Sequence, residues 1–310
     1  MRRSFAAGLA ALTLLLLAGC GGSKASPSEV PEQPSEEPAP PEPTAEELAA
    51  REIETILSSL TLEEKVGQLF FVRCPAEHAI EDIGTYHLGG YLLFGRDYQD
   101  AAGSWLTEEQ FVQTITAYQD AALADTGIPL LIGSDEEGGT VTRASRNPNL
   151  FSSPFRSPQQ IAAEAGGRGE AFAEDALEKS NGLKNLGINV NLSPVADVST
   201  EPKDFIYDRT LGQDAQSTAD YVASVVAAVR EAGGMGSVLK HFTGYGNNVD
   251  THTGIAVDQR SLESFFSSDF LPFQAGIRAG GGTAAVLVSH NIMTAVDETL
   301  PSSLSPAVHQ

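Results

Sequence analysis

Short apolar runs alternate with longer stretches of mixed polarity from residue 44 onward. The runs are rich in Leu, Ile, Val and Phe, which is typical of buried β-strands. They predict strands at residues 68–72, 88–94, 129–133, 188–192, 237–239 and 284–288.

The stretches between these runs predict helices. A Thr or Ser followed three residues later by Glu or Gln begins four of them, which is the form of a capping box. The helices are expected from Thr44, from Thr61, over residues 107–124, over residues 157–185 with Pro158 in its first turn, over 217–232 and over 262–279.

Strands that alternate with helices predict parallel βαβ units, either in an open doubly wound sheet or in a (β/α)8 TIM-type barrel. No G-x-G-x-x-G follows the first strand, which disfavours a dinucleotide-binding sheet. Polar residues instead follow several different strands, where barrel enzymes assemble their sites. These residues are Asp135, Asp197, Lys240, His241 and His290. We therefore expect an α/β fold, a TIM-type barrel, and we expect its last strands to be missing from this chain.

The first 43 residues are expected to lie outside this fold. Residues 1–20 have the form of a signal peptide, in which Arg2 and Arg3 precede an apolar run too short to span a bilayer. The run ends in Leu-Ala-Gly-Cys20, which resembles a bacterial lipobox whose cysteine becomes lipidated; an ordinary secretory signal is the alternative. Residues 21–43, rich in Pro, Ser and Glu, predict an extended linker to a domain over residues 44–310. We expect an exported protein, held by a lipid anchor at the outer face of a bacterial membrane.

Composition narrows the set of partners. A formal net charge of −22 argues against nucleic acid and anionic lipid as direct ligands. Only Cys20 and Cys74 are present, and with Cys20 lipidated we expect Cys74 to be a buried, inert thiol. His78, His87 and His309 have no supporting residues around them. No metal-ligand spacing such as H-E-x-x-H occurs, so neither a metal nor a cofactor is predicted.

The segment from Lys240 to His252 carries the densest chemistry in the chain. It places a cation, two imidazoles and a carboxylate directly after a predicted buried strand. Asp250 and His252 are two residues apart, so an extended loop puts both side chains on one side. The carboxylate then holds one ring nitrogen and leaves the other facing a substrate, which is how a general acid/base is oriented.

Five motifs occur in order between residues 135 and 305, and the resemblance that they carry runs from about residue 61 to residue 310. They are Asp135-Glu-Glu-Gly-Gly-Thr-Val-Thr-Arg143, Leu186-Gly-Ile-Asn-Val-Asn-Leu-Ser-Pro-Val-Ala-Asp197, Asp208-Arg209 with Leu211-Gly212, Lys240-His241-Phe242-Thr243-Gly244-Tyr245-Gly246 with Asp250-Thr251-His252, and Val288-Ser-His290 with Ser303-Leu-Ser305. Together they resemble glycoside hydrolase family 3, and in particular its β-N-acetylhexosaminidase branch.

The resemblance implies a role for each matched position. His252 corresponds to the acid/base and Asp250 to its orienting carboxylate. The expected substrate-binding residues are Asp135, Arg143, Arg209, Lys240, His241 and His290. We expect Asp197 to orient an arginine or lysine across the barrel mouth. Glu136 and Glu137, which follow Asp135 in the sequence, are expected to form a solvated acidic turn.

The chain departs from the family pattern at three places. Thr243 replaces a usual proline and Tyr245 a usual histidine, changes that bear on loop rigidity or substrate preference. In the family the nucleophilic aspartate follows the Ser303-Leu-Ser305 segment, and no residue here matches it. We therefore expect the 310 residues by themselves to lack hydrolytic activity.

The resemblance implies a retaining glycoside hydrolase that removes terminal β-linked N-acetylglucosamine from cell-wall fragments or other glycans. Alternatives within the family are a β-glucosidase, a β-xylosidase or a phosphorylase, because an uncharged imidazole base tolerates incoming phosphate. From a different class, a non-catalytic glycan-binding lipoprotein would keep the binding residues and lack the nucleophile.

Overall fold

The computed structural model describes residues 43–166 and 169–309. The predicted signal peptide with Cys20, and the linker up to residue 42, lie outside the described residues. Contacts divide the chain into two units, Met1–Arg51 and Glu52–Gln310. The sheet and all of the predicted catalytic and substrate-binding residues belong to the second unit.

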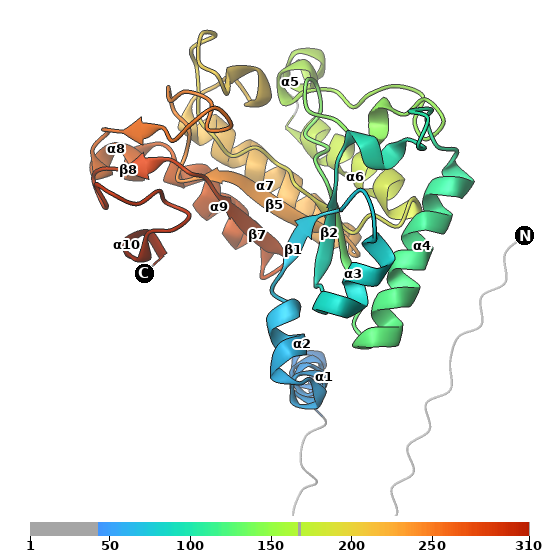
Figure 1. Ribbon diagram of the computed structural model, residues 1–310. Coiled ribbons are helices and arrows are strands. Elements are labelled where there is room, and N and C mark those ends of the chain that lie inside the picture. Colours follow the sequence, from blue (N-terminus) through green and yellow to red (C-terminus); the bar gives the residue numbers. More distant parts are fainter. Residues whose placement is uncertain (1–42, 167–168, 310) are drawn as a thin grey trace, which may run out of the picture. The chain divides into compact units, whose positions relative to one another are not determined.

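A six-stranded parallel sheet, drawn in Figure 1, organises the second unit. Its spatial order is β1-β2-β3-β4-β5-β7, so strands adjacent in the sheet follow one another along the chain and each connection crosses over through a helix or loop. The strands are β1 (Phe71–Arg73), β2 (Gly90–Leu93), β3 (Leu131–Ser134), β4 (Val190–Asn191), β5 (Gly236–Phe242) and β7 (Ala284–Val288). The sheet curls as a barrel wall does, and β1 and β7 are its two edges among the described residues. This confirms the expected α/β fold with an incomplete TIM-type barrel.

Helices connect the strands and pack on their neighbours in the chain. Helix α3 packs against α4, α6 packs against α7, and α7 packs against α9. The helices are α1 (Ala45–Ser59), α2 (Leu62–Gly67), α3 (Ala79–Tyr86), α4 (Glu108–Asp125), α5 (Pro158–Ala165), α6 (Glu170–Asn185), α7 (Ala215–Ala232), α8 (Leu262–Ser267), α9 (Phe270–Gly280) and α10 (Pro306–His309), with 3-10 turns at Gly95–Tyr98, Ala144–Arg146 and Tyr207–Arg209. All four predicted capping boxes form, at Thr44, Thr61, Thr107 and Ser157. No helix in the described part of the chain is long and apolar enough to cross a membrane.

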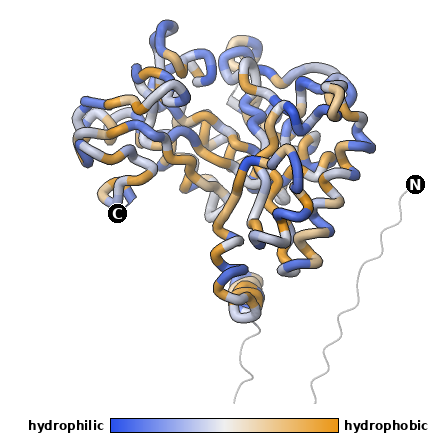
Figure 2. Tube along the Cα trace, in the orientation of Figure 1, coloured by the Kyte–Doolittle hydropathy of each residue, from blue (hydrophilic) through white to orange (hydrophobic). Residues whose placement is uncertain are grey.

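The two faces of the sheet bury different side chains, because successive residues of a strand point in opposite directions. In β5, Leu239 belongs to the large core shared with the helices, whereas Val238 belongs to a second cluster. That second cluster draws Phe71, Leu92, Val190, Leu192, Val238 and Leu287 from five strands or their ends. Figure 2 shows the hydrophobic segments concentrated along the strands. Lys240 lies two residues after Val238 and therefore emerges on the same inner face.

Two predicted helices are each interrupted in the structure. The expected helix over residues 157–185 ends as α5 at Gly166, which has φ +57° in the left-handed region, and resumes as α6. The expected helix over residues 262–279 breaks at Ser268, whose φ of −133° and ψ of −83° are not helical. The strand predicted at residues 237–239 is longer, so Lys240 and His241 lie within β5 and not after it. Helices α3 and α10 were not predicted.

A second, two-stranded sheet also escaped prediction. It pairs β6 (Val257–Asp258) with β8 (Ile292–Met293) in parallel. The pairing joins the segment that follows the 240–252 loop to the segment that follows β7. It therefore braces the polar loops beyond the carboxyl ends of β5 and β7.

Two helical glycines provide a test of the packing between α7, α9 and β5. A Cβ on Gly276 would lie 2.7 Å from Leu239 Cδ1 and 2.8 Å from Val222 Cγ1, whereas a Cβ on Gly84 in α3 meets nothing within 4 Å. Gly84→Ala should stabilise by about 1 kcal/mol through helix propensity. Gly276→Ala should destabilise, because overpacking costs about 1–3 kcal/mol and exceeds that gain. Urea unfolding of both variants measures the two signs; stabilisation by both would contradict this packing.

Candidate active site

A cavity of about 390 Å³ opens at the carboxyl ends of the strands. It collects side chains that are far apart in the sequence and come from β3, β5, β7 and the loops that follow them. The predicted residues that line it are Asp135, Arg143, Arg209, Lys240, His241, His252 and His290. Asp250 stands behind His252, to which it is hydrogen-bonded. The structure therefore brings all eight predicted site residues to one place.

Lys240 forms the floor of this cavity. Its ammonium lies 2.6 Å from Asp135 Oδ1 and 2.6 Å from Glu137 Oε1, and the residue is only 2% exposed. A buried ammonium needs such partners, because an unpaired charge would be strongly unfavourable away from water. The two ion pairs join the end of β3 to β5 across 105 residues of sequence.

Glu137 is the second centre of charge, and sequence reasoning missed it. Arg209 donates to it through two parallel hydrogen bonds, Nε to Oε2 at 2.9 Å and Nη2 to Oε1 at 2.8 Å. Burial by itself raises the pKa of Glu137, but the adjacent Lys240 ammonium and Arg209 guanidinium outweigh it and bring that pKa down to about 2. The expectation of a solvated acidic turn is wrong, because Glu136 and Glu137 are both buried.

Glu136 holds the loop that presents Arg143. Its carboxylate accepts hydrogen bonds from the backbone N–H groups of Arg143 and Ala144, and from the Ser145 hydroxyl at 2.8 Å. Burial raises the pKa of Glu136 despite these donors. The turn also requires a glycine at residue 138, where φ is +96° and a Cβ would lie 1.9 Å from the Arg156 carbonyl oxygen.

Arg143 is the least committed cation of the cavity. Its Nη2 lies 3.6 Å from Asp135 Oδ2, and its guanidinium carbon lies 5.7 Å from the centre of the Phe94 ring. The buried Nε atom has no hydrogen-bond partner among the described residues. Its Nη1 donates to the Thr142 carbonyl at 3.3 Å, so the contacts of this guanidinium with the protein are long ones.

His241 is held in one orientation from both sides. Its Nδ1 lies 2.8 Å from Asp197 Oδ2, and its Nε2 lies 3.0 Å from Arg209 Nη2. Because the guanidinium only donates, Nε2 accepts and Nδ1 carries the proton given to Asp197. Asp197 also accepts from the backbone N–H groups of His241 and Tyr245. The expectation that Asp197 orients an arginine or lysine is therefore corrected: its partners are His241 and the loop backbone.

The loop after β5 carries the Asp250–His252 pair. Asp250 Oδ1 lies 2.6 Å from His252 Nδ1 and accepts from the His252 backbone N–H at 2.9 Å. The backbone bond, followed by the bond to the ring, lowers the pKa of Asp250. The His252 side chain is 77% exposed, and its Nε2 remains free to meet a substrate.

An ionic cluster lies beneath the first turn of this loop. Arg260 pairs with Asp258 at 2.7 Å and with Asp269 at 2.9 Å. The backbone packs so closely here that a Cβ on Gly244 would lie 2.3 Å from Asp269 Oδ1, and one on Gly246 would lie 2.6 Å from Arg260 Nη1. Both glycines also have positive φ values, which explains the Gly-x-Gly spacing after β5. Burial raises the pKa of Asp269 to about 6 although Arg260 opposes the shift.

His290 lines the opposite wall of the cavity, beyond the end of β7. Its Nδ1 contacts the Ser303 hydroxyl, which fixes the ring through a segment 13 residues later. Its other nitrogen is available to a ligand. Elsewhere, Cys74 is buried as expected, and burial raises the pKa of its thiol to about 11.

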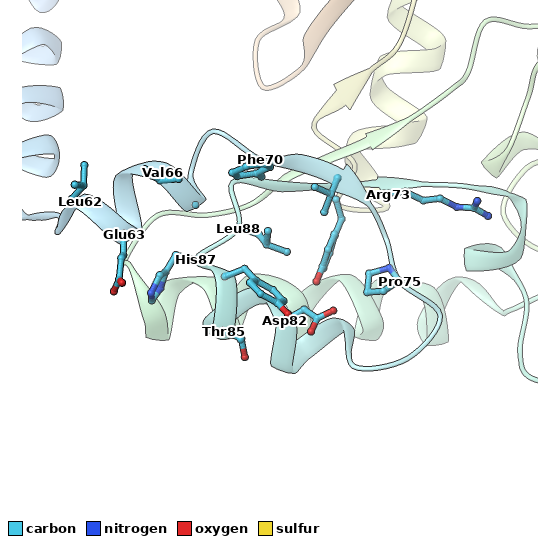
Figure 3. Close-up of a pocket in the computed structure, with 14 residues that line it drawn as sticks. Leu62, Glu63, Val66, Phe70, Arg73, Pro75, Asp82, Thr85, His87 and Leu88 are labelled. Carbon is cyan, nitrogen blue, oxygen red and sulfur yellow. The ribbon is translucent and has the colours of Figure 1, made fainter. Parts of the chain in front are cut away.

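A larger cavity, of about 760 Å³, lies along β1, α2 and α3 and holds none of the predicted residues. Figure 3 shows Leu62, Val66, Phe70 and Leu88 along it, with Glu63 and Asp82 at its edge. Its lining is mainly apolar, and its polar residues belong to none of the five motifs, so volume alone does not identify the site. Among the described residues, no three His, Cys, Asp or Glu side chains are grouped so that they could hold a metal ion.

Comparison with known proteins identifies relatives of the whole barrel region. Residues 61–310 match the model of the glycosyl hydrolase family 3 N-terminal domain. The chain is 30% identical over 224 residues to "Beta-hexosaminidase A" of Pseudoalteromonas piscicida, covering 71% of this chain and 35% of that protein. It is 32% identical over 212 residues to "Beta-hexosaminidase" of Thiobacillus denitrificans, covering 68% and 55%.

A solved structure shows the same fold. The glycoside hydrolase family 3 β-N-acetylglucosaminidase from Paenibacillus sp. str. FPU-7 superposes with a TM-score of 0.68 at 27% identity, covering 80% of this chain and 46% of that one. The chain thus spans between about a third and somewhat over half of the length of these relatives.

The charge on Glu137 should be visible in the pH dependence of stability. The native pKa of Glu137, about 2, lies below the ordinary value of 4.5. Its contribution to the free energy of unfolding is therefore fully present above about pH 4.5 and is lost as the pH falls through about 2. Glu137→Gln should lower the free energy of unfolding by on the order of 3 kcal/mol at pH 7. The gap to the unmodified protein should shrink as the pH falls from about 4.5.

Glu164→Gln is the matched control for this prediction. Glu164 also pairs with an arginine, Arg156, but its side chain is 58% exposed. Removing an exposed pair should cost at most about 1 kcal/mol. Denaturant unfolding at a series of pH values measures both variants. A Glu137→Gln cost as small as the control, or one that stays constant down to pH 3, would contradict the buried ion pairs.

Proposed function

Because the chain belongs to glycosyl hydrolase family 3 through its N-terminal domain, we propose that it binds the terminal sugar and supplies the acid/base of a β-N-acetylhexosaminidase. The proposed reaction removes terminal β-linked N-acetylglucosamine with retention of configuration. The matched relatives carry the name β-hexosaminidase, which supports this substrate class. The chain covers part of their length, so the activity of the whole protein is part of the proposal.

The observation that carries the proposal is the Asp250–His252 pair beside a cavity lined with charged and hydrogen-bonding side chains. Cleavage of a glycosidic bond requires a proton on the leaving oxygen, and a later water must lose one. His252 presents Nε2 for both transfers while Asp250 holds Nδ1 at 2.6 Å. As Nε2 takes up a proton, the Asp250 carboxylate stabilises the resulting imidazolium.

The remaining residues bind the sugar. Asp135 accepts from hydroxyl groups while Lys240 holds its carboxylate in place. Arg143 donates from the cavity wall, where its nearest carboxylate, Asp135, lies 3.6 Å away. His241 is fixed by Asp197 and presents its edge to the cavity, and His290 donates or accepts from the opposite wall. Polar groups of both kinds around one cavity are what a polyhydroxylated ligand requires.

No described residue is proposed as the nucleophile. Asp135 and Glu137 are the carboxylates that line the cavity, and Lys240 engages both. Glu137 also receives two hydrogen bonds from Arg209. Such engagement stabilises the charge of a carboxylate and lowers its nucleophilicity, so these two residues are assigned to binding and to the framework.

Substitutions of His252 and Asp250 in the full protein test the acid/base role. His252→Ala should slow substrates with poor leaving groups by about 10²–10⁴-fold, because their leaving oxygen needs a proton. Activated aryl glycosides, which depart unaided, should lose much less. Asp250→Ala should show a milder form of this pattern. Steady-state kinetics on both substrate classes, with and without added phosphate, measures the effect and shows whether the acceptor is water or phosphate.

His78→Ala is the control, because His78 forms a similar exposed pair with Glu81 away from the cavity. It should leave both rates unchanged. Equal losses on both leaving-group classes after His252→Ala would assign His252 to binding and would move the acid/base elsewhere. Binding of N-acetylglucosamine without turnover of any glycoside would favour the non-catalytic alternative.

The lipobox-like segment that ends at Cys20 supports a further part of the proposal, namely export and lipid anchoring. Cys20→Ala should transfer the mature protein from the membrane fraction to the periplasm or medium, because a lipidated N-terminal cysteine is the proposed attachment. Fractionation and immunoblotting measure the distribution, with Cys74→Ala as the control that removes the other cysteine. A Cys20→Ala protein that remains in the membrane fraction would contradict the anchor.

A further inference from the structure

Tyr245 connects the floor of the cavity to the loop that carries His252. Its backbone N–H donates to Asp197 Oδ1 at 2.7 Å, and its ring meets the His241 ring edge-on, with centroids 5.2 Å apart at 89°. The side chain is 1% exposed. Its hydroxyl forms a hydrogen bond with Oγ1 of Thr251. One residue therefore touches both the sugar-binding wall and the acid/base loop.

Thr251 is the residue between Asp250 and His252, and the other hydrogen bonds of its turn join residues within the turn. Asp250 forms hydrogen bonds with His252 and with Thr253, and both partners lie within residues 250–253. Among the described residues, the Tyr245–Thr251 contact is the only hydrogen bond that joins residues 249–253 to other parts of the chain. Packing does little to replace it, because Val249 is 65% exposed and the His252 side chain 77% exposed.

We propose that Tyr245 is a positioning residue for the acid/base loop, whose phenol latches Thr251 and thereby sets where the Asp250–His252 pair stands over the bound sugar. This inference rests on the proposed function for its effect on catalysis. The latch acts through Thr251 and does not touch the substrate. Displacing a proton donor by about 1 Å slows the catalysed step strongly, so the loss of this single hydrogen bond should lower the rate.

Three substitutions isolate the two hydroxyl groups. Tyr245→Phe and Thr251→Val each remove one hydroxyl and keep the ring or the branched shape, whereas Thr251→Ser keeps the hydroxyl. The first two should lower kcat about three- to tenfold on poor leaving groups, the effect of one lost hydrogen bond, with KM unchanged. Activated aryl glycosides should lose less. Thr251→Ser should retain the rate, and the double variant should be no slower than either single one.

Tyr91→Phe is the matched control. Tyr91 is as buried as Tyr245, and its hydroxyl donates to the Ala79 carbonyl at 2.7 Å, away from the proposed active site. This variant loses the same kind of hydrogen bond and should leave the leaving-group dependence unchanged. If Tyr245→Phe instead raises KM, or slows both substrate classes equally, Tyr245 supports His241 and the sugar-binding wall, and the latch is overturned.

A measurement without turnover separates the latch from the proposed function. Nuclear magnetic resonance of histidine-labelled protein, with the His252 signals assigned from His252→Ala, reports the loop directly. Tyr245→Phe and Thr251→Val should shift or broaden the His252 ring signals in the same way, and Thr251→Ser and Tyr91→Phe should not. Unchanged His252 signals in both hydroxyl deletions would overturn the latch. A shift in a protein that hydrolyses no glycoside would uphold the latch and reject the proposed reaction.

Discussion

The ammonium of Lys240, held 2.6 Å from Asp135 and 2.6 Å from Glu137, is the interaction on which the site depends. It joins the carboxyl end of β3 to β5 and is buried on the inner face of the sheet. Glu137 extends the network to Arg209, and Arg209 reaches His241. A group of alternating charges at the mouth of an apolar barrel interior thus sets the positions of the side chains around the cavity before any ligand arrives.

Much of this arrangement could be predicted because parallel α/β folds follow two rules that can be applied to short stretches of sequence. Alternating apolar runs and capped helices predict βαβ units, and residues at the carboxyl ends of such strands converge. That reasoning placed Asp135, Asp197, Lys240, His241 and His290 at one mouth. The cavity is lined by all of them except Asp197, which contacts His241 from behind. The pairing of Asp250 with His252 was also predicted, but from an extended loop. Residues 250–253 instead form a turn, in which the Asp250 carbonyl accepts from the Thr253 backbone N–H and the Asp250 carboxylate reaches His252.

The partners within the site could not be predicted in the same way, because they depend on which side chains meet across long intervals. Glu137 looked like one of two solvated acids until its bonds to Arg209, 72 residues away, were visible. Asp197 serves His241, 44 residues later. Helix interruptions at Gly166 and Ser268 were missed because amphipathic periodicity continues past a local break in backbone conformation. The sequence shows Gly244 and Gly246 in the 240–252 segment. It does not show that Asp269 and Arg260 pack against them and leave no room for a Cβ.

The measurement that tests the account most directly is a structure of the protein with N-acetylglucosamine bound. The account predicts the sugar in the cavity of about 390 Å³, with Asp135 accepting from its hydroxyl groups, Arg143 donating to it and His252 Nε2 facing its anomeric oxygen. Sugar bound in the apolar cavity beside β1, or bound in the predicted cavity with its anomeric oxygen turned away from His252, would contradict the account.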